Sequence, residues 1–315
     1  MYRTLELLGS ALVAAIVLFA TVASPAQGEI FALSSEVEKT TLRGEQEGLT
    51  KIGVDGGTVS CEVAKFAGEM SGEYAFETAF TPTYEKCNMG EGSSAEVKMN
   101  GCKLVFTTGT KEGSNYELEA RIRCESGKSI SIVKTVLGVT KCTVDIGPQA
   151  GLSKATATEA GSPSAIKTSI ALSGIKYSQT AGTGLGACAT AENTSNGTYE
   201  GTETIKGFVG ETQQPMKDEA LPKTIEISKN PVQFNGMNTT ATFDITNISG
   251  ESLTITNFVI DGTLMHMAKC VNKTLAKKGD KCTEEMKCVA PGGEEPWIGV
   301  IVGPPGGART KAKGC

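Results

Sequence analysis

The 315-residue sequence contains one histidine, His266, and one tryptophan, and only 5% of its residues are aromatic. A single imidazole cannot build a histidine-based zinc or copper site. It also limits any Ser-His-Asp or Cys-His triad to one position, and the sequence has no G-x-S-x-G element. We therefore expect a protein that is not an enzyme, with no catalytic, cofactor-binding or metal-binding residues. We interpret His266 as an ordinary strand or loop residue.

Nucleotide and nucleic-acid motifs are also missing. The Gly-rich stretch 182–186 lacks the Gly-Lys-Ser/Thr of a phosphate loop. The net charge of −5 argues against a nucleic-acid or anionic-membrane partner, because either would require clustered Lys and Arg. We interpret the acidic pairs Glu284-Glu285 and Glu294-Glu295 as solvated loop residues. Past residue 28, no apolar run reaches the roughly 18 residues of a spanning helix, so we expect no transmembrane anchor after signal cleavage.

The first 28 residues contain the longest apolar segment. Arg3 precedes an apolar run from Leu7 to Val22, and small residues follow from Ser24 to Gly28. This order of charged head, apolar core and small residues predicts a secretory signal peptide over residues 1–28. We expect the remaining chain to be secreted and extracellular, or loosely associated with the cell envelope.

Cysteine is plentiful, with ten residues. An even count in an exported chain predicts disulfides, and close C-x2-C pairs typical of zinc sites are absent. Six cysteines precede residue 212 and four follow residue 224, which allows 15 and 3 pairings respectively, so the connectivity stays open. Nearness in sequence favours Cys87–Cys102, Cys124–Cys142 and Cys270–Cys282, which leaves Cys61–Cys188 and Cys288–Cys315.

Residues 52–210 consist of short β-prone runs separated by Gly, Ser, Asn and Thr. Alternation of apolar and polar residues with frequent turns predicts an all-β fold, here an antiparallel β-sandwich or barrel with disulfides. Asn100-Gly101 predicts a β-hairpin, which would bring the neighbourhood of Cys87 close to the strand of Cys102. The expected strands are Thr58–Val63, Gly72–Phe80, Ala95–Met99, Lys103–Thr108, Tyr116–Cys124, Ser129–Val133, Cys142–Ile146, Ile166–Leu172, Gly174–Gln179 and Gly197–Gly207.

Two flanking segments look less regular. Residues 29–51 are polar and uneven, and we expect an irregular lead-in that is extended or holds a short helix at Ser34–Arg43. Residues 211–224 are polar and contain proline, which predicts a linker. The chain would then divide into a signal peptide, a lead-in, a disulfide-bridged β domain over 52–210, a linker, and a second domain over 225–315.

The second domain begins with a proline-led strand, continues with a strand that ends in Thr-Asn-x-Ser-Gly, and then reads Leu-Thr-Ile-Thr. The residues that carry this pattern are Pro231, Phe234, Phe243, Ile245, Asn247, Gly250, Leu253, Ile255 and Val259. Over roughly residues 225–285 the pattern resembles the immunoglobulin-like repeats called choice-of-anchor D or ASH domains. The resemblance implies an Ig-like β-sandwich of about seven strands, a cysteine pair near Cys270 and Cys282, and an interaction or spacer role. Beyond residue 285 the sequence departs from that pattern, so we expect an atypical C-terminal end.

The first domain contains three distinctive short motifs, which are Phe80-Thr81-Pro82-Thr83-Tyr84-x-x-Cys87, Asn100-Gly101-Cys102 and Asn196-Gly197-Thr198-Tyr199-x-Gly201. On these motifs the domain resembles an uncharacterised family of Thr-rich, cysteine-bridged proteins secreted by Gram-positive bacteria. The resemblance implies no activity.

These observations favour a secreted or cell-surface, non-catalytic β protein that serves adhesion, binding or spacing at the cell envelope. Its partner would be a protein or a cell-wall component. One alternative is an extracellular hydrolase with two carboxylates in residues 52–210, because a carboxylate pair suffices for glycoside hydrolysis. Another is a small-ligand carrier, which requires a hollow barrel with a cavity of about 300 Å³ or more.

Overall fold

The computed structural model describes residues 30–313 except 38, 113, 162–163, 185–186, 230, 237, 261–263, 267–268, 289–296 and 304–305. Every element in these residues is a β-strand, and the predicted all-β class is confirmed. Across the same residues, no helix has the length and apolar character needed to cross a membrane. The predicted signal peptide and Cys315 lie outside the described residues.

The first unit is built from one thirteen-stranded antiparallel sheet. Its inward positions alternate with exposed ones, as in β13, where Ile170 and Leu172 are buried while Ser169, Ala171 and Ser173 are exposed. The strands are β2 (Lys39–Gln46), β3 (Thr50–Val54), β4 (Gly57–Ser71), β6 (Glu77–Asn88), β7 (Ser94–Lys98), β8 (Cys102–Glu112), β9 (Asn115–Cys124), β10 (Ile130–Val136), β11 (Val139–Ile146), β12 (Gln149–Ala160), β13 (Ala165–Ala181), β14 (Ala191–Val209) and β15 (Thr212–Gln214).

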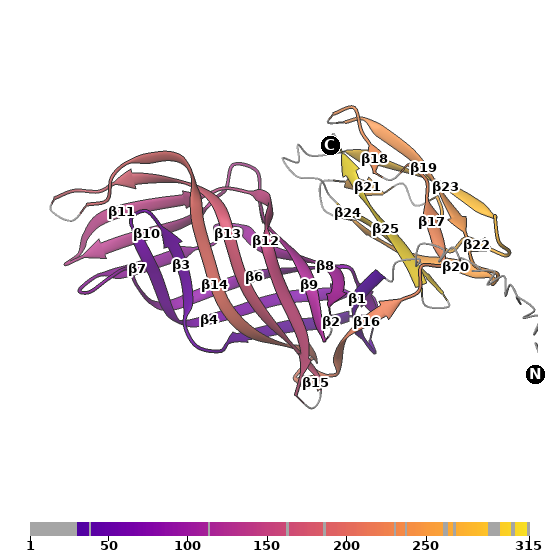
Figure 1. Ribbon diagram of the computed structural model, residues 1–315, viewed down its shortest axis with the longest axis horizontal. Coiled ribbons are helices and arrows are strands. Elements are labelled where there is room, and N and C mark those ends of the chain that lie inside the picture. The colour runs from indigo at the N-terminus through magenta and orange to yellow at the C-terminus, as the bar shows by residue number, and fades with distance from the viewer. Residues whose placement is uncertain are drawn as a thin grey trace, which may run out of the picture.

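This sheet closes on itself twice. One ring runs β4-β6-β8-β9-β12-β13-β14-β2 and returns to β4, and the second runs β6-β7-β10-β11-β13-β14-β3-β4 and returns to β6. The long strands β4, β6, β13 and β14 belong to both rings, so the unit is an elongated barrel with two closed sections (Figure 1). The inward side chains of both sections form one apolar core. Strands in such rings are paired on both sides, which removes the open edges that invite pairing with other chains.

The flanking segments are more regular than the sequence indicates. Strands β1 (Ile30–Ser35), β16 (Met216–Leu221) and β5 (Tyr74–Ala75) form a three-stranded sheet in the order β16-β1-β5. Of the two forms expected for the lead-in, the extended one is confirmed and the short helix at Ser34–Arg43 is wrong. These residues belong to β1 and β2, and Thr40 and Leu42 of β2 are buried. The segment 211–224, expected to be a linker, contains β15 and β16, and long-range pairing with β1 orders it.

The second unit is an Ig-like β-sandwich, as predicted. One sheet has the order β17-β19-β23-β21 and the other β18-β25-β24-β20-β22, which corresponds to the ABED and GFC arrangement of immunoglobulin folds. The parallel pair β18–β25 connects the first strand region to the last. The strands are β17 (Ile225–Ile227), β18 (Val232–Gln233), β19 (Thr240–Asn247), β20 (Leu253–Ile260), β21 (Leu264–His266), β22 (Thr274–Leu275), β23 (Lys281–Cys288), β24 (Trp297–Gly303) and β25 (Gly306–Lys313).

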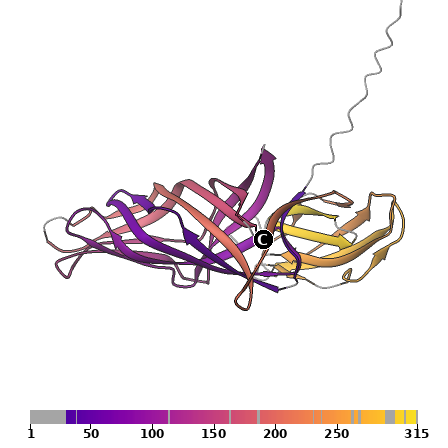
Figure 2. The same cartoon turned by 90° about the horizontal axis from the view of Figure 1, so that it is seen from below.

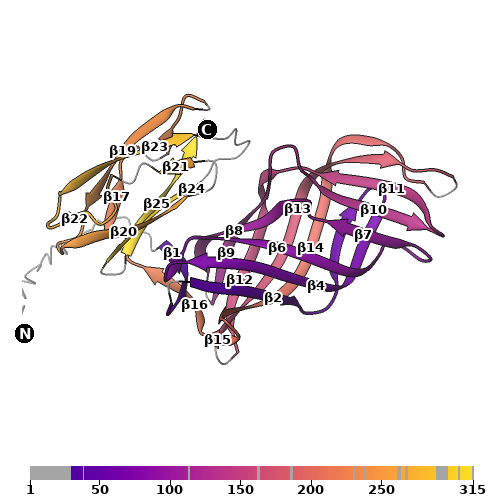
Figure 3. The ribbon, with the colours of Figure 1, turned by 180° about the vertical axis from the view of Figure 1, so that it is seen from behind.

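Barrel and sandwich lie end to end. Figures 1 and 3 place β1 and β16 at the end of the barrel that faces the sandwich, and Figure 2 shows the same elongated form after a quarter turn. Ala32, Phe76 and Leu221 from the barrel side are buried together with Ile301 of β24. A small apolar cluster therefore joins the two units.

Four disulfides are defined among the described residues: Cys61–Cys87, Cys102–Cys124, Cys142–Cys188 and Cys270–Cys282. The prediction of Cys270–Cys282 is confirmed, whereas Cys87–Cys102, Cys124–Cys142 and Cys61–Cys188 are wrong. Sheet register decides the pairing, because Cys61 lies opposite Cys87 and Cys102 lies opposite Cys124. Cys288 is also disulfide-bonded, and its expected partner, Cys315, lies outside the described residues.

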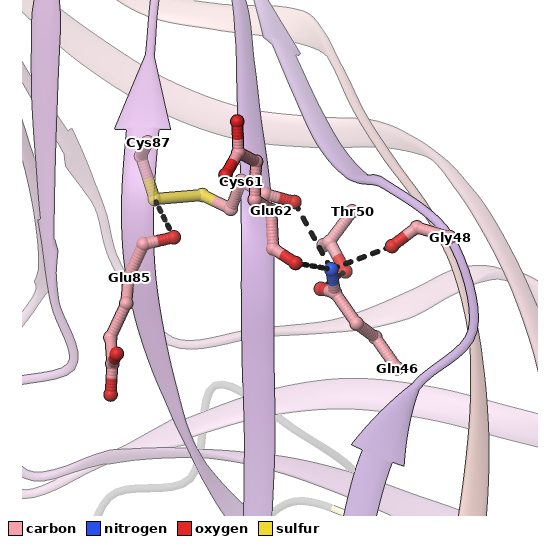
Figure 4. The surroundings of a disulfide bond; sticks show 7 residues. All are labelled: Gln46, Gly48, Thr50, Cys61, Glu62, Glu85 and Cys87. Carbon is pink, nitrogen blue, oxygen red and sulfur yellow. Dashed lines mark hydrogen bonds between the residues drawn. A yellow bond between two sulfur atoms is a disulfide. The ribbon is translucent and has the colours of Figure 1, made fainter.

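The Cys61–Cys87 bridge also lies beside the turn between β2 and β3. Gln46 Nε2 donates hydrogen bonds to the carbonyl oxygens of Glu62 at 2.6 Å and Cys61 at 3.3 Å (Figure 4).

The expected Asn100-Gly101 hairpin is a turn only. Strands β7 and β8 on either side of it do not pair with each other, and each pairs with β6 instead.

Candidate functional site

The interior of the barrel is filled by side chains. One interior cavity, of about 30 Å³, is lined by Phe80, Phe106 and Asp218 among others, and a second, of about 20 Å³, lies beside Tyr84 and Tyr199. Each holds only one or two water molecules, whereas ligand pockets usually measure about 300–1,000 Å³. The described part of the barrel therefore does not provide the cavity that a small-ligand carrier needs.

Glu77 is the first of three acids in this unit that are largely shielded from solvent. It accepts hydrogen bonds from Arg121 Nη2 and, at 3.0 Å, from Arg123 Nη1. The Arg121 side chain is 5% exposed and the Glu77 side chain 11% exposed. The carboxylate is held between two guanidinium groups by charge-assisted hydrogen bonds, so this cluster joins β6 to β9.

Glu203 is the second buried acid, and its neighbours include the hydroxyl groups of Tyr84 and Tyr199. It is 1% exposed and projects from β14 into the barrel, where its Oε1 accepts a hydrogen bond from Tyr199 Oη at 3.4 Å. Its Oε2 has no hydrogen-bond partner among the described residues. Burial raises the pKa of Glu203 to about 8, and it raises the pKa of the neighbouring Tyr84 and Tyr199 hydroxyls as well.

Asp218 on β16 is the third. Its Oδ2 has no hydrogen-bond partner in the described part of the chain, and its carbonyl oxygen accepts a hydrogen bond from Tyr116 Oη at 2.9 Å. Burial, reinforced by the negative charge of Glu159, raises the pKa of Asp218 to about 7. Asp218 and Glu203 are therefore proton-binding groups inside a packed core.

Glu203 and Asp218 have raised pKa values, as catalytic carboxyl groups often do, but a substrate cannot reach them. A two-carboxylate hydrolase requires room between its acids for a sugar and a water, and the interior cavities beside Asp218 and Tyr199 are water-sized.

His266 lies in β21, where it pairs with Met286 of β23 in the sandwich sheet. Within the described residues, no group of three or more His, Cys, Asp or Glu is placed to hold a metal ion.

A different feature lies on the outer face of the barrel. An open groove of about 360 Å³ is lined by Glu47, Asn115, Thr156, Thr158, Lys167, Ser169 and Thr202. Its floor is formed by neighbouring strands, because Thr156 of β12 lies opposite Ser169 of β13, and Ser169 lies opposite Thr202 of β14. The groove is therefore a stripe of hydroxyl groups that crosses adjacent strands.

The charges in this groove are paired with each other. Lys167 Nζ lies 2.5 Å from Glu47 Oε2, and the Thr204 hydroxyl also donates to the Glu47 carboxylate. The hydrogen bond from Lys167 is the main reason that the pKa of Glu47 is lowered. The groove is consequently polar but close to neutral.

The groove was not predicted from the sequence, and the expectation that Glu284 is solvated is wrong. The signal for the groove was present as Thr156-x-Thr158, Lys167-x-Ser169 and Thr202-x-Thr204, each on the outward phase of a strand. Glu284, expected to be solvated, is fully buried in β23, where its carboxylate accepts hydrogen bonds from the backbone N–H groups of Lys269, Cys270 and Glu285. The buried Glu284 carboxylate therefore fixes the backbone of Lys269 and Cys270 against β23.

No family model and no curated protein matches this chain. Two solved structures of Escherichia coli alpha-2-macroglobulin align over 91% of it. The native conformation aligns at 8% identity with a TM-score of 0.22, and the form activated by porcine elastase at 10% identity with a TM-score of 0.21. The chain spans 29% and 43% of those two chains. Scores this low carry no argument about fold or function.

Proposed function

We propose that this chain is a non-catalytic extracellular protein that binds a component of the cell envelope and spaces it from its surroundings. The observation that supports this most directly is the closed and filled barrel. Its packed core offers water-sized cavities, so recognition is assigned to the outer surfaces of the barrel and the sandwich.

Two further observations support an extracellular envelope role. Disulfides persist in oxidising compartments, and both units carry them. The end-to-end arrangement of barrel and sandwich separates two surfaces along one long axis (Figure 2). An elongated, bridged β protein is suited to hold a bound component at a fixed distance.

The proposal is tested by co-sedimentation of the purified, oxidised protein with insoluble envelope fragments of a Gram-positive bacterium, together with an assay for released sugars and peptides. We expect saturable sedimentation that excess unlabelled protein competes away, and no release of products. Absence of saturable sedimentation would overturn the binding role. Product release that Glu203→Gln or Asp218→Asn abolishes would instead establish the hydrolase alternative.

A further inference from the structure

We propose that the outer groove of the barrel is a binding site for a neutral polysaccharide strand. This inference rests on the proposed envelope-binding function and names the chemistry of its ligand. The groove is the outer-face stripe defined above, with Thr156, Ser169 and Thr202 along its floor and Asn115 at its side.

The lining is chemically complementary to sugar hydroxyl groups. The side chains of Asn115, Thr156, Ser169 and Thr202 make no hydrogen bond to other described residues, so their donors and acceptors are available to a ligand. Each hydroxyl supplies one donor and two acceptors, and the Asn amide supplies two of each. A polyol chain, whose hydroxyl groups also donate and accept, matches this set.

The charge pattern disfavours ionic ligands. Glu47 and Lys167 are the charged residues of the lining, and their side chains neutralise each other at 2.5 Å. An anionic or cationic polymer would have to break this pair before it met an opposite charge. A neutral ligand leaves the pair intact.

The fold also disfavours an extended peptide that adds to the sheet. Strands β12, β13 and β14 at the floor are each paired on both sides, so their backbone groups are not available for β-strand addition. Recognition must come from side chains. Because the groove is open to solvent, an extended chain can cross it without being enclosed.

Binding at a single groove should be weak. The described lining contains no aromatic residue, so the stacking surface that many sugar sites use is absent there. Hydroxyl–hydroxyl hydrogen bonds only replace bonds to water, which limits their net contribution. We expect a Kd on the order of 1 mM for a short oligosaccharide, with tighter apparent binding to a polymer through many contacts.

The test is titration of the oxidised, isotopically labelled protein with two neutral probes, cellotetraose and the tetramer of N-acetylglucosamine, followed by NMR. We expect shifts of the groove amides with at least one probe, and affinity that is insensitive to salt because no charge is neutralised. The variant T156V/T202V removes two hydroxyl groups while keeping β-branched shapes, and should weaken binding about tenfold. The control T180V alters an exposed threonine elsewhere on β13 and should bind like the parent.

Equal binding by the parent and T156V/T202V, or no groove shifts with either probe, would overturn the inference. Thermal unfolding of each variant verifies that it is folded. The envelope sedimentation assay separates the two levels of proposal. If the parent and T156V/T202V sediment equally with envelope fragments, the proposal that the groove is the binding site is wrong and the proposed envelope-binding function stands. If neither sediments, both proposals are wrong.

Discussion

At the scale of single residues, the notable cost in this molecule is the burial of two acids that each leave one carboxyl oxygen unpaired among the described residues. Glu203 Oε2 and Asp218 Oδ2 both lack a hydrogen-bond partner among the described residues. Removing an ionised carboxylate from water costs several kcal/mol unless it is paired. The folded chain therefore favours the protonated form of both acids, and its stability must depend on pH.

The pKa of Glu203 gives this dependence a sign. Its pKa rises from an ordinary value of 4.5 to about 8 on folding, so between these pH values the folded chain holds a proton that the unfolded chain has released. The contribution of Glu203 to the free energy of unfolding is therefore fully present below about pH 4.5 and is lost as the pH rises toward 8. Asp218 acts in the same direction up to about pH 7.

We expect Glu203→Gln to raise the free energy of unfolding at about pH 9 by on the order of 3 kcal/mol, and to change it little at about pH 5. Glutamine cannot ionise, so the penalty of a buried charge disappears. Urea unfolding at both pH values measures the effect, with exposed Glu200→Gln on the same strand as control. If E203Q showed the same pH dependence as the parent, the burial of this acid would not be its cause.

At the scale of elements, the β10–β11 hairpin contains an unfavourable turn. Leu137 and Gly138 at its tip have φ angles of 48° and 79°, as in the type I′ turns that favour Asn-Gly. A leucine is strained in this region, and here its side chain is 95% exposed. The side chain therefore gains little from packing to offset the strain.

We expect Leu137→Asn to stabilise the chain by about 0.5–1 kcal/mol, because asparagine adopts positive φ more readily and is polar. Gly138→Ala, the matched control in the same turn, should destabilise by about 1 kcal/mol. Thermal unfolding of both variants gives the comparison. A less stable L137N would mean that the Leu137 side chain contributes packing in solution.

Local patterns predicted many of the strands but not their partners. The expected runs Ile166–Leu172 and Gly174–Gln179 both lie in β13, where Gly174, at a φ of 75°, accommodates a register shift and lets one strand continue. Strand β12 went unpredicted because its buried positions include small residues, Ala155 and Ala157, which give little apolar contrast.

Partner choice depends on contacts distant in sequence, which alternation alone does not encode. Strand β16 pairs with β1 from the other end of the unit, and the register between β4 and β6 sets the pairing of Cys61 with Cys87. The groove likewise arises only when β12, β13 and β14 are placed side by side. The sequence therefore predicted the class of fold, while the disulfide map and the candidate site required the structure.

At the scale of the whole molecule, the question is whether barrel and sandwich move as one body. Phe76 packs with Leu221 and Ile301 at the junction, and Lys223 forms a parallel bridge with Gly307 of β25. A Cβ atom added to Gly299 of β24 would overlap the Phe76 ring. The absence of a side chain at residue 299 therefore permits the close contact between the two units.

We expect Gly299→Ala to displace the Phe76 ring and to cost about 1–3 kcal/mol through overpacking at the junction. Because Phe76 lies in the apolar cluster that joins the described parts of the two units, this loss should uncouple them. We then expect two separate thermal transitions and an increase in the radius of gyration measured by small-angle scattering. Gly303→Ala on the same strand is the matched control, since its added Cβ would lie 3.6 Å from Thr256 Cγ2, an ordinary contact. If G299A and the parent both unfolded in one transition and had the same radius of gyration, the junction would not fix the two units. The spacing role proposed for the chain would then have to rest on each unit separately.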